Sequence, residues 1–162
     1  MRDERPRRWF LFLGFMALGS KLFGKEYHEM HPQAWSFSSI NDAAMALYGK
    51  EKFATMQKSD AVVLEVPSVI KDPERIPIVV GTTLEAKTIA IFQDRQEKSL
   101  VAVFDASVQH STVSVQKDAV VFEFEMKMES KGTLFAVVET VEGKLYYTRA
   151  YADITCLACI AK

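Results

Sequence analysis

Cysteine is scarce in this 162-residue chain, and its glycines are scattered. Only Cys156 and Cys159 occur, which excludes a secreted scaffold held by several disulfide bridges, although this one pair can still be oxidised. None of the seven glycines clusters ahead of an expected helix, so phosphate-loop and dinucleotide-binding motifs are absent. These absences disfavour a nucleotide-dependent enzyme.

An excess of basic charge is lacking as well, and so is a long apolar run. The formal net charge is −1 and the basic residues form no stripe, which removes the footprint of sequence-independent nucleic-acid binding. The uncharged run Trp9–Ser20 is well short of the roughly 20 residues that a membrane-spanning helix needs, so no stable membrane insertion is expected. With 49% apolar and 25% charged residues, the composition is that of one soluble globular domain.

The first 24 residues have the layout of an export signal. Arginines precede the uncharged run, and Arg7 and Arg8, followed by Trp9, resemble the twin-arginine consensus that a translocase for folded proteins reads. We therefore expect residues 1–24 to be a twin-arginine-type export signal and the protein to be periplasmic. The alternative is an interfacial apolar helix that stays on the protein, because no clear small-x-small cleavage site is present.

Residues 25–37 show no helical or strand period and are expected to be a linker. His28 and His31 lie three residues apart, a spacing that allows a shared metal ion, but no third ligand is near them in the sequence. Solvated linker histidines and no metal site are therefore expected here.

A short amphipathic helix is expected next. The sequence from Ser39 to Asp42 resembles a capping box, and Gly49 is a typical helix end. Between them, apolar residues repeat on one helical face, and the pattern predicts about three turns. These residues are Ile40, Ala43, Ala44 and Leu47.

Downstream of this helix the period changes to the alternation of β-strands. In 120–128, apolar and charged residues alternate, so one face should lie in a core and the other in water. Glu123, Glu125 and Glu129 are thus expected on a solvated sheet surface with Lys127, rather than as an acid–base pair for catalysis. The other expected strands are 61–66, 76–80, 87–92, 100–105, 113–116, 134–141 and 145–155.

Turn residues separate these segments at intervals of about 8 to 12 residues, and Glu142-Gly143 joins two long strands as a hairpin would. No second helical pattern crosses over a parallel sheet. The sequence therefore predicts an all-β fold, an immunoglobulin-like antiparallel β-sandwich of about seven strands preceded by one short helix. Helix and sandwich together are expected to form one domain, residues 38–155.

The remaining segment, 156–162, carries both thiols. A thiol acts as a nucleophile only as the thiolate, and a position near the chain end gives access that a buried cysteine lacks. One alternative is that Cys156 and Cys159 are small apolar residues closing the last strand. A redox disulfide requires a turn after Thr155, because three extended residues separate Cα atoms by about 10 Å, beyond the roughly 7 Å that a bridge allows. An intramolecular structural zinc would need two further ligands and is not expected.

The order of these features resembles the SoxY family, the sulfur-carrier subunit of the bacterial thiosulfate-oxidising Sox system. The resemblance covers about residues 36–159. The twin-arginine signal fits, because this family is exported folded in complex with its partner SoxZ. The residues that carry the resemblance are the helix 41–50, the strand pair 64–67 and 76–80, Ile91-Phe92 followed by 101–104, and 137–140 through Gly143 and Tyr146 to Ile154-Thr155.

The resemblance implies a carrier subunit rather than an enzyme, with no cofactor other than sulfur species bound covalently to cysteine. That cysteine would sit at the tip of a C-terminal swinging arm, and by position it is Cys159, while Cys156 either resolves the adduct as a disulfide or is a bystander. The implied partners are a SoxZ-like subunit in a heterodimer and the Sox enzymes SoxAX, SoxB and SoxCD. The family tail reads Gly-Gly-Cys-Gly-Gly, whereas Leu-Ala at 157–158 and Ile-Ala at 160–161 flank the cysteine here. The flexibility that glycine gives an arm is therefore reduced.

A second class of function stays open. The chain can be a binding or redox module on the same sandwich, whose Cys156–Cys159 pair cycles between dithiol and disulfide or donates two thiolates to a shared metal.

The aromatic residues of the last strand point to a covered face. Alternation places Tyr147 and Tyr151 on one side of the sheet, beside Phe135 and Phe92. We expect a partner subunit to cover this apolar face, and the domain expressed alone to self-associate.

Overall fold

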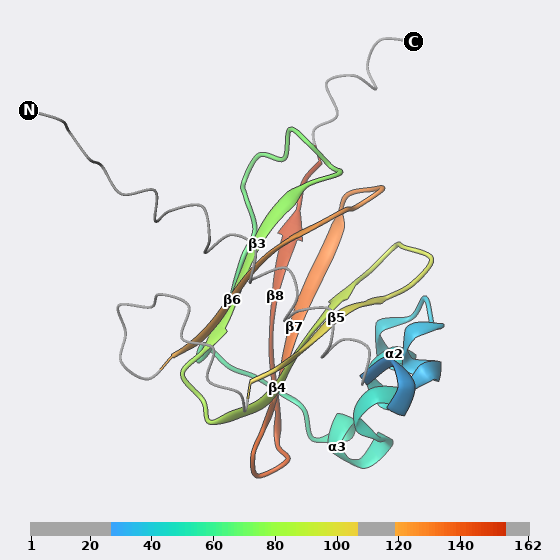
Figure 1. Cartoon of the computed structure of the whole chain (residues 1–162), viewed down its shortest axis with the longest axis vertical. Helices are drawn as coiled ribbons and strands as arrows, with labels where there is room; N and C mark the ends of the chain where they lie inside the picture. Colours follow the sequence, from blue (N-terminus) through green and yellow to red (C-terminus); the bar gives the residue numbers. More distant parts are fainter. Residues whose placement is uncertain (1–26, 107–118, 155–162) are drawn as a thin grey trace, which may run out of the picture.

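Two β-sheets pack face to face, and a small helical layer covers one of them (Figure 1). The computed structural model describes residues 27–106 and 119–154. The expected strand 113–116 lies outside the described residues, as do the expected export signal with Arg7 and Arg8, and the tail with Cys156 and Cys159.

The expected helix is confirmed as α2 (Ile40–Tyr48). Ser39 is its N-cap, and the Ser39 side chain accepts a hydrogen bond from the Asp42 backbone N–H at 3.4 Å. Gly49 ends the helix at φ +89°, a conformation that residues with a side chain rarely adopt. The capping pattern and the glycine therefore set both ends of α2.

The helical layer contains two elements that the sequence did not indicate. The 3₁₀-helix η1 (Pro32–Trp35) lies within the segment expected to be a linker, and its Ala34 is fully buried against α2 and the sheet. The expectation of no element between 25 and 37 is thus wrong, because four residues are too few to show a period. The single-turn helix α3 (Lys50–Ala54) follows Gly49 directly.

The strands form an immunoglobulin-like β-sandwich, which confirms the expected fold class. One sheet, called sheet A here, has the strand order β1-β8-β7-β4-β5, and the other, sheet B, has the order β2-β3-β6. All pairings are antiparallel except that of β1 with β8. The strands are β1 (Gln57–Lys58), β2 (Val62–Glu65), β3 (Ile76–Thr82), β4 (Ala86–Gln93), β5 (Leu100–Asp105), β6 (Val120–Met126), β7 (Gly132–Thr140) and β8 (Leu145–Ala152).

Most strands match the expected segments to within two residues at each end, and two elements differ by more. β8 ends at Ala152 rather than at residue 155, and the two-residue β1 is too short for any sequence pattern. The expected hairpin between β7 and β8 is confirmed: Gly143 turns at φ +80°, and its N–H donates to the Thr140 carbonyl at 2.8 Å.

The two sheets differ in what covers them. β6 has one face on sheet A's side and one in solvent, so Glu123 and Glu125 are exposed as expected. Glu125 pairs with Arg75, and Lys127 pairs with Glu74, on this solvated surface. β4 and β7 are buried on both faces, because sheet B covers the inner face of sheet A and the helices cover its outer face.

The aromatic face expected under a partner subunit is largely covered by the chain itself. Phe92 is fully buried beneath the helical layer, and Phe135 and Tyr147 pack at the edge of the same cluster. Tyr146 points to the opposite side, into the core between the sheets. Only Tyr151 remains strongly exposed, at 57%. Intramolecular packing therefore replaces most of the expected intermolecular contact.

Candidate functional site

The described structure includes the point from which the two-cysteine segment continues. β8 ends at Ala152, which is fully buried, and Ile154 forms a parallel β-bridge with Ile70 of the β2–β3 connection. Both isoleucines pack in one apolar cluster with Met128. Packing and backbone pairing thus hold the chain against the sandwich up to two residues before Cys156.

This end of the sandwich, called the tail-exit end here, also contains the connections β2–β3 and β6–β7 (Figure 1). The Met128 N–H donates to the Pro73 carbonyl at 3.0 Å and joins the two connections. Val69 and Tyr151 expose more than half of their surface here, at 58% and 57%. The tail therefore starts from a rigid base with apolar groups at its surface.

The four residues expected to carry function, Arg7, Arg8, Cys156 and Cys159, all lie outside the described residues. The structure brings none of them together in a described site. His28 lies beside Trp35 with ring centroids 5.5 Å apart. Within 27–106 and 119–154, no group of three or more histidine, cysteine, aspartate or glutamate side chains is placed to hold a metal ion. No helix of this part is long and apolar enough to cross a membrane.

A buried charge lies under the helical layer. The Glu139 side chain on β7 is 8% exposed, and its carboxylate accepts a hydrogen bond from Lys52 of α3 at 2.5 Å, with Lys87 at 3.8 Å. Burial raises the pKa of the nearby Tyr48 hydroxyl far above its usual value, and the Glu139 charge acts in the same direction. The Lys52–Glu139 pair therefore connects α3 to sheet A.

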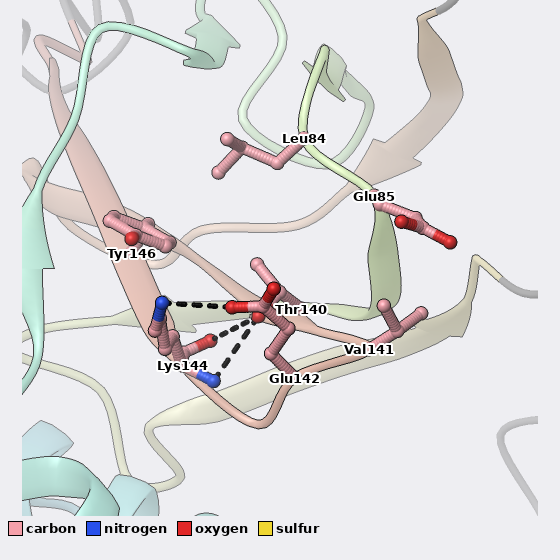
Figure 2. A pocket seen from close by; sticks show the side chains of 7 residues that line it. All are labelled: Leu84, Glu85, Thr140, Val141, Glu142, Lys144 and Tyr146. Carbon is pink, nitrogen blue, oxygen red and sulfur yellow. Dashed lines mark hydrogen bonds and ion pairs between the residues drawn. The ribbon is translucent and has the colours of Figure 1, made fainter.

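A pocket of about 200 Å³ lies beside the β7–β8 hairpin, and Figure 2 shows the side chains that line it. Glu142 and Lys144 form an exposed ion pair at 2.8 Å, which lowers the pKa of the Glu142 carboxyl and raises that of the Lys144 ammonium. β8 starts at this hairpin and runs eight residues, roughly 26 Å, to the tail-exit end. The pocket is therefore remote from the segment that carries the cysteines.

A second cavity, of about 320 Å³, lies between the helices and the outer face of sheet A and is called the outer groove here. Asn41 provides the one amide among its lining residues, and Tyr147 the one hydroxyl; none is charged. The lining residues are Ile40, Asn41, Ala44, Phe53, Met56, Phe135, Val137 and Tyr147.

Sequence reasoning missed the Lys52–Glu139 pair and the outer groove. The sequence contained an indication of the ion pair, because Glu139 is the one charged residue in the apolar run 134–141. A charge at such a position predicts a buried partner. The groove had no comparable signal, since its two walls are distant in the sequence.

Comparison with known proteins agrees with this architecture. The sequence matches the family "Sulfur oxidation protein SoxY" over residues 44–159. The structure of the sulfur carrier protein SoxY from Chlorobium limicola f thiosulfatophilum is similar, with a TM-score of 0.54 and 26% sequence identity, covering 75% of this chain and 96% of that chain. No curated protein sequence gives a significant match.

Weaker structural likenesses exist to superoxide reductases. Those from Ignicoccus hospitalis and Nanoarchaeum equitans have TM-scores of 0.41 each and identities of 12% and 15%. They cover 58% and 60% of this chain, and 80% and 99% of their own chains. Likenesses at this level support no inference about function. The SoxY match, by contrast, extends over well over half of the sequence, from α2 to Cys159. The chain belongs to the SoxY family of sulfur oxidation proteins.

Proposed function

We propose that this protein is a periplasmic sulfur carrier of a Sox-type thiosulfate or sulfur oxidation system and holds sulfur intermediates covalently on Cys159. The observation that carries the proposal is the SoxY family match, which extends through the tail to Cys159. The similar structure from Chlorobium limicola f thiosulfatophilum is itself described as a sulfur carrier protein. The carrier performs no chemical step alone, so each step requires a partner enzyme.

The anchored end of β8 supports Cys159 over Cys156 as the attachment point. Ile154 is tied to Ile70, and a chain extends at most about 3.6 Å per residue. The Cα of Cys156 therefore lies within about 7 Å of the Ile154 Cα, whereas Cys159 has a reach of about 18 Å. Only the longer reach takes a thiol clear of the tail-exit end and into the active site of another protein.

The loading step is an oxidation at sulfur. With thiosulfate as the donor, the Cys159 thiolate and the sulfane sulfur form a new S–S bond, and two electrons leave to an oxidising partner enzyme. The product is a cysteine thiosulfonate with the sulfonate group still attached. The role open to Cys156 is discharge by exchange: its thiolate attacks the Cys159 sulfur, a Cys156–Cys159 disulfide forms, and thiosulfate leaves.

The proposal includes the partners and the compartment. A SoxZ-like subunit forms the heterodimer, and SoxAX, SoxB and SoxCD act on the bound sulfur in turn. The signal at residues 1–24, with Arg7 and Arg8, directs export of the folded complex to the periplasm. The cofactor requirement of the carrier is limited to the sulfur species on cysteine.

The test is mass spectrometry of the C-terminal peptide from protein purified without reductant, after incubation with thiosulfate and the partner enzymes. The wild type should gain sulfur-derived mass. The Cys159→Ser variant should lose loading, and the matched Cys156→Ser variant should keep it or gain, because a discharging thiol is gone. Loading lost only in Cys156→Ser would contradict the assignment.

The alternative redox or metal module gives a different result in the same experiment. A dithiol–disulfide cycle shows only the loss of two hydrogens, with no added sulfur. Either a disulfide or a shared metal requires both sulfurs, so equal loss of function from the two serine variants would favour that alternative.

A further inference from the structure

The outer groove is an apolar site without an occupant in the described part of the chain. Its walls are α2 and α3 on one side and β7 and β8 on the other. Its volume of about 320 Å³ is near the lower limit of the roughly 300 to 1,000 Å³ typical of ligand pockets. Asn41 is the one side-chain amide in the lining, so the convergent polar groups that orient a small polar ligand are missing. The chemistry suits a large apolar side chain.

Two cations flank the aromatic floor of the groove. Arg149 lies directly opposite Phe135 in the β7–β8 ladder, and Lys58 is in register with Tyr147 in the β1–β8 pair. Side chains at such neighbouring positions share a face of the sheet, with Cβ atoms about 5 Å apart. Both cations are exposed, and neither has an ion-pair partner among residues 27–106 and 119–154.

The two charges that strand register places beside the floor residues Phe135 and Tyr147 are both positive, although Arg149 and Lys58 are not themselves lining residues. The acidic residues of α2 and α3 are Asp42 and Glu51, and neither lines the groove. Glu139, on the same face of β7, is buried and already paired with Lys52. An occupant that complements this face has an apolar anchor and negative charge beside it.

The groove floor includes a residue of β8, the strand that leads to the cysteine segment. From Tyr147, at the groove floor, to Ile154 the chain runs seven residues, roughly 23 Å. A partner anchored in the groove would have to extend over about this distance along β8 for its own active site to meet the cysteine segment.

From this complementarity we propose that the outer groove docks a segment of a partner protein, inserting one large apolar side chain between α2 and β8 and setting carboxylates against Arg149 and Lys58. This inference rests on the carrier function proposed above, because only a carrier needs to bind partner enzymes in turn. Apolar anchors in such grooves supply most of the affinity, while flanking charges set specificity.

The test uses the full-length chain, labelled with nitrogen-15, and three synthetic twelve-residue peptides. The first has a central leucine-phenylalanine pair flanked by glutamates. The second has lysines in place of the glutamates, and the third has serines in place of the two apolar residues. As the first peptide is added, the amide chemical shifts of the lining residues should change and fit a sub-millimolar dissociation constant. The other two should bind at least tenfold more weakly.

Charge reversal provides the decisive variant. In K58E/R149E the preference should invert, so that the lysine peptide binds better than the glutamate peptide. Both side chains are exposed, so the fold should be retained. The control is R75E, which reverses an exposed cation directly before β3 of the other sheet. Arg75 pairs with Glu125 there, and its reversal should leave the wild-type order of peptide affinities unchanged.

Three results would overturn the proposal: no shifts at the lining residues with any peptide, equal affinities for the glutamate and lysine peptides, or inversion in R75E as well. Chemical shifts of the lining residues that change with protein concentration in the absence of peptide would mean that a second copy of the chain occupies the groove. That result would also overturn the proposal. The mass of the tail peptide is measured on the same samples. Sulfur loading without peptide binding refutes the groove alone, whereas peptide binding without loading refutes the carrier function alone.

Discussion

The ion pair between Lys52 and Glu139 should be a main contact that holds α3 on the sandwich. A five-residue helix is not stable alone, so α3 depends on what it packs against. Removing the ammonium in Lys52→Met leaves a carboxylate that is 8% exposed, with Lys87 at 3.8 Å as its remaining cation. A hydrogen bond to a charged group contributes about 1.5 to 3 kcal/mol to folding. Lys52 is itself 44% exposed, and solvent screening places its contribution at the lower end of this range, about 1.5 kcal/mol.

The two lysines differ in distance from the same carboxylate, so they provide an internal control. Lys87→Met should lower the free energy of unfolding by about 0.5 kcal/mol or less, because an exposed pair at 3.8 Å is weak. In a double-mutant cycle of Lys52→Met with Glu139→Gln, the coupling energy should be about 1.5 kcal/mol. Urea denaturation followed by circular dichroism measures each value. The thermal midpoint of Lys52→Met should fall by roughly 5 °C.

Equal costs for Lys52→Met and Lys87→Met would refute this reasoning, and so would a coupling energy below about 0.3 kcal/mol between Lys52 and Glu139. Either result would mean that apolar contacts such as those of Phe53 hold α3 in place without the ion pair.

Three further predictions concern packing and protonation. Phe92→Ala should lower the free energy of unfolding, measured by urea denaturation, by about 4 kcal/mol, because Phe92 of β4 is fully buried beneath the helices. The exposed Tyr151→Ala should lower it by less than about 0.5 kcal/mol, and similar values for both would contradict the burial of Phe92 under the helical layer. The raised pKa of Tyr48 favours its neutral form in the folded state, so the free energy of unfolding should fall as pH rises above about 10, and Tyr48→Phe should show a smaller fall across the same pH titration. Gly132→Ala should lower the thermal midpoint, because the new Cβ meets the Asp94 carboxylate, which accepts a hydrogen bond from the Thr133 N–H at 2.6 Å. Adding Asp94→Gly to this variant should raise the midpoint again, and an unchanged midpoint would contradict the clash.

Local patterns in the sequence identified the elements that depend on local rules. Ser39 and Gly49 set the ends of α2 because capping hydrogen bonds and a left-handed backbone are properties of a few adjacent residues. The alternation in β6 is visible because only one face of this strand is buried. In 87–92 the pattern is nearly continuous instead, and its cause, cover on both faces of sheet A, lies outside the strand.

Elements shorter than one pattern repeat were missed. η1 has four residues, α3 five and β1 two, and each owes its conformation to what it packs or pairs with. The same limit explains why cover by the helical layer was not predicted for this face. Phe92 and Tyr147 indicated an apolar face that needs cover, but the sequence alone does not say whether that cover comes from the same chain.

The sequence by itself determined the fold class and the family resemblance, and both are confirmed. The assignment of Cys159 stays a prediction, because the tail lies outside the described residues. Strand period, capping and the order of motifs are local properties, and they are readable without coordinates. Only the tertiary structure decided that α2 and α3 cover sheet A, that Lys52 meets Glu139 across 87 residues, and that a groove flanked by Arg149 and Lys58 remains open. These features depend on which distant segments come together, and that choice follows from burying all apolar faces at once.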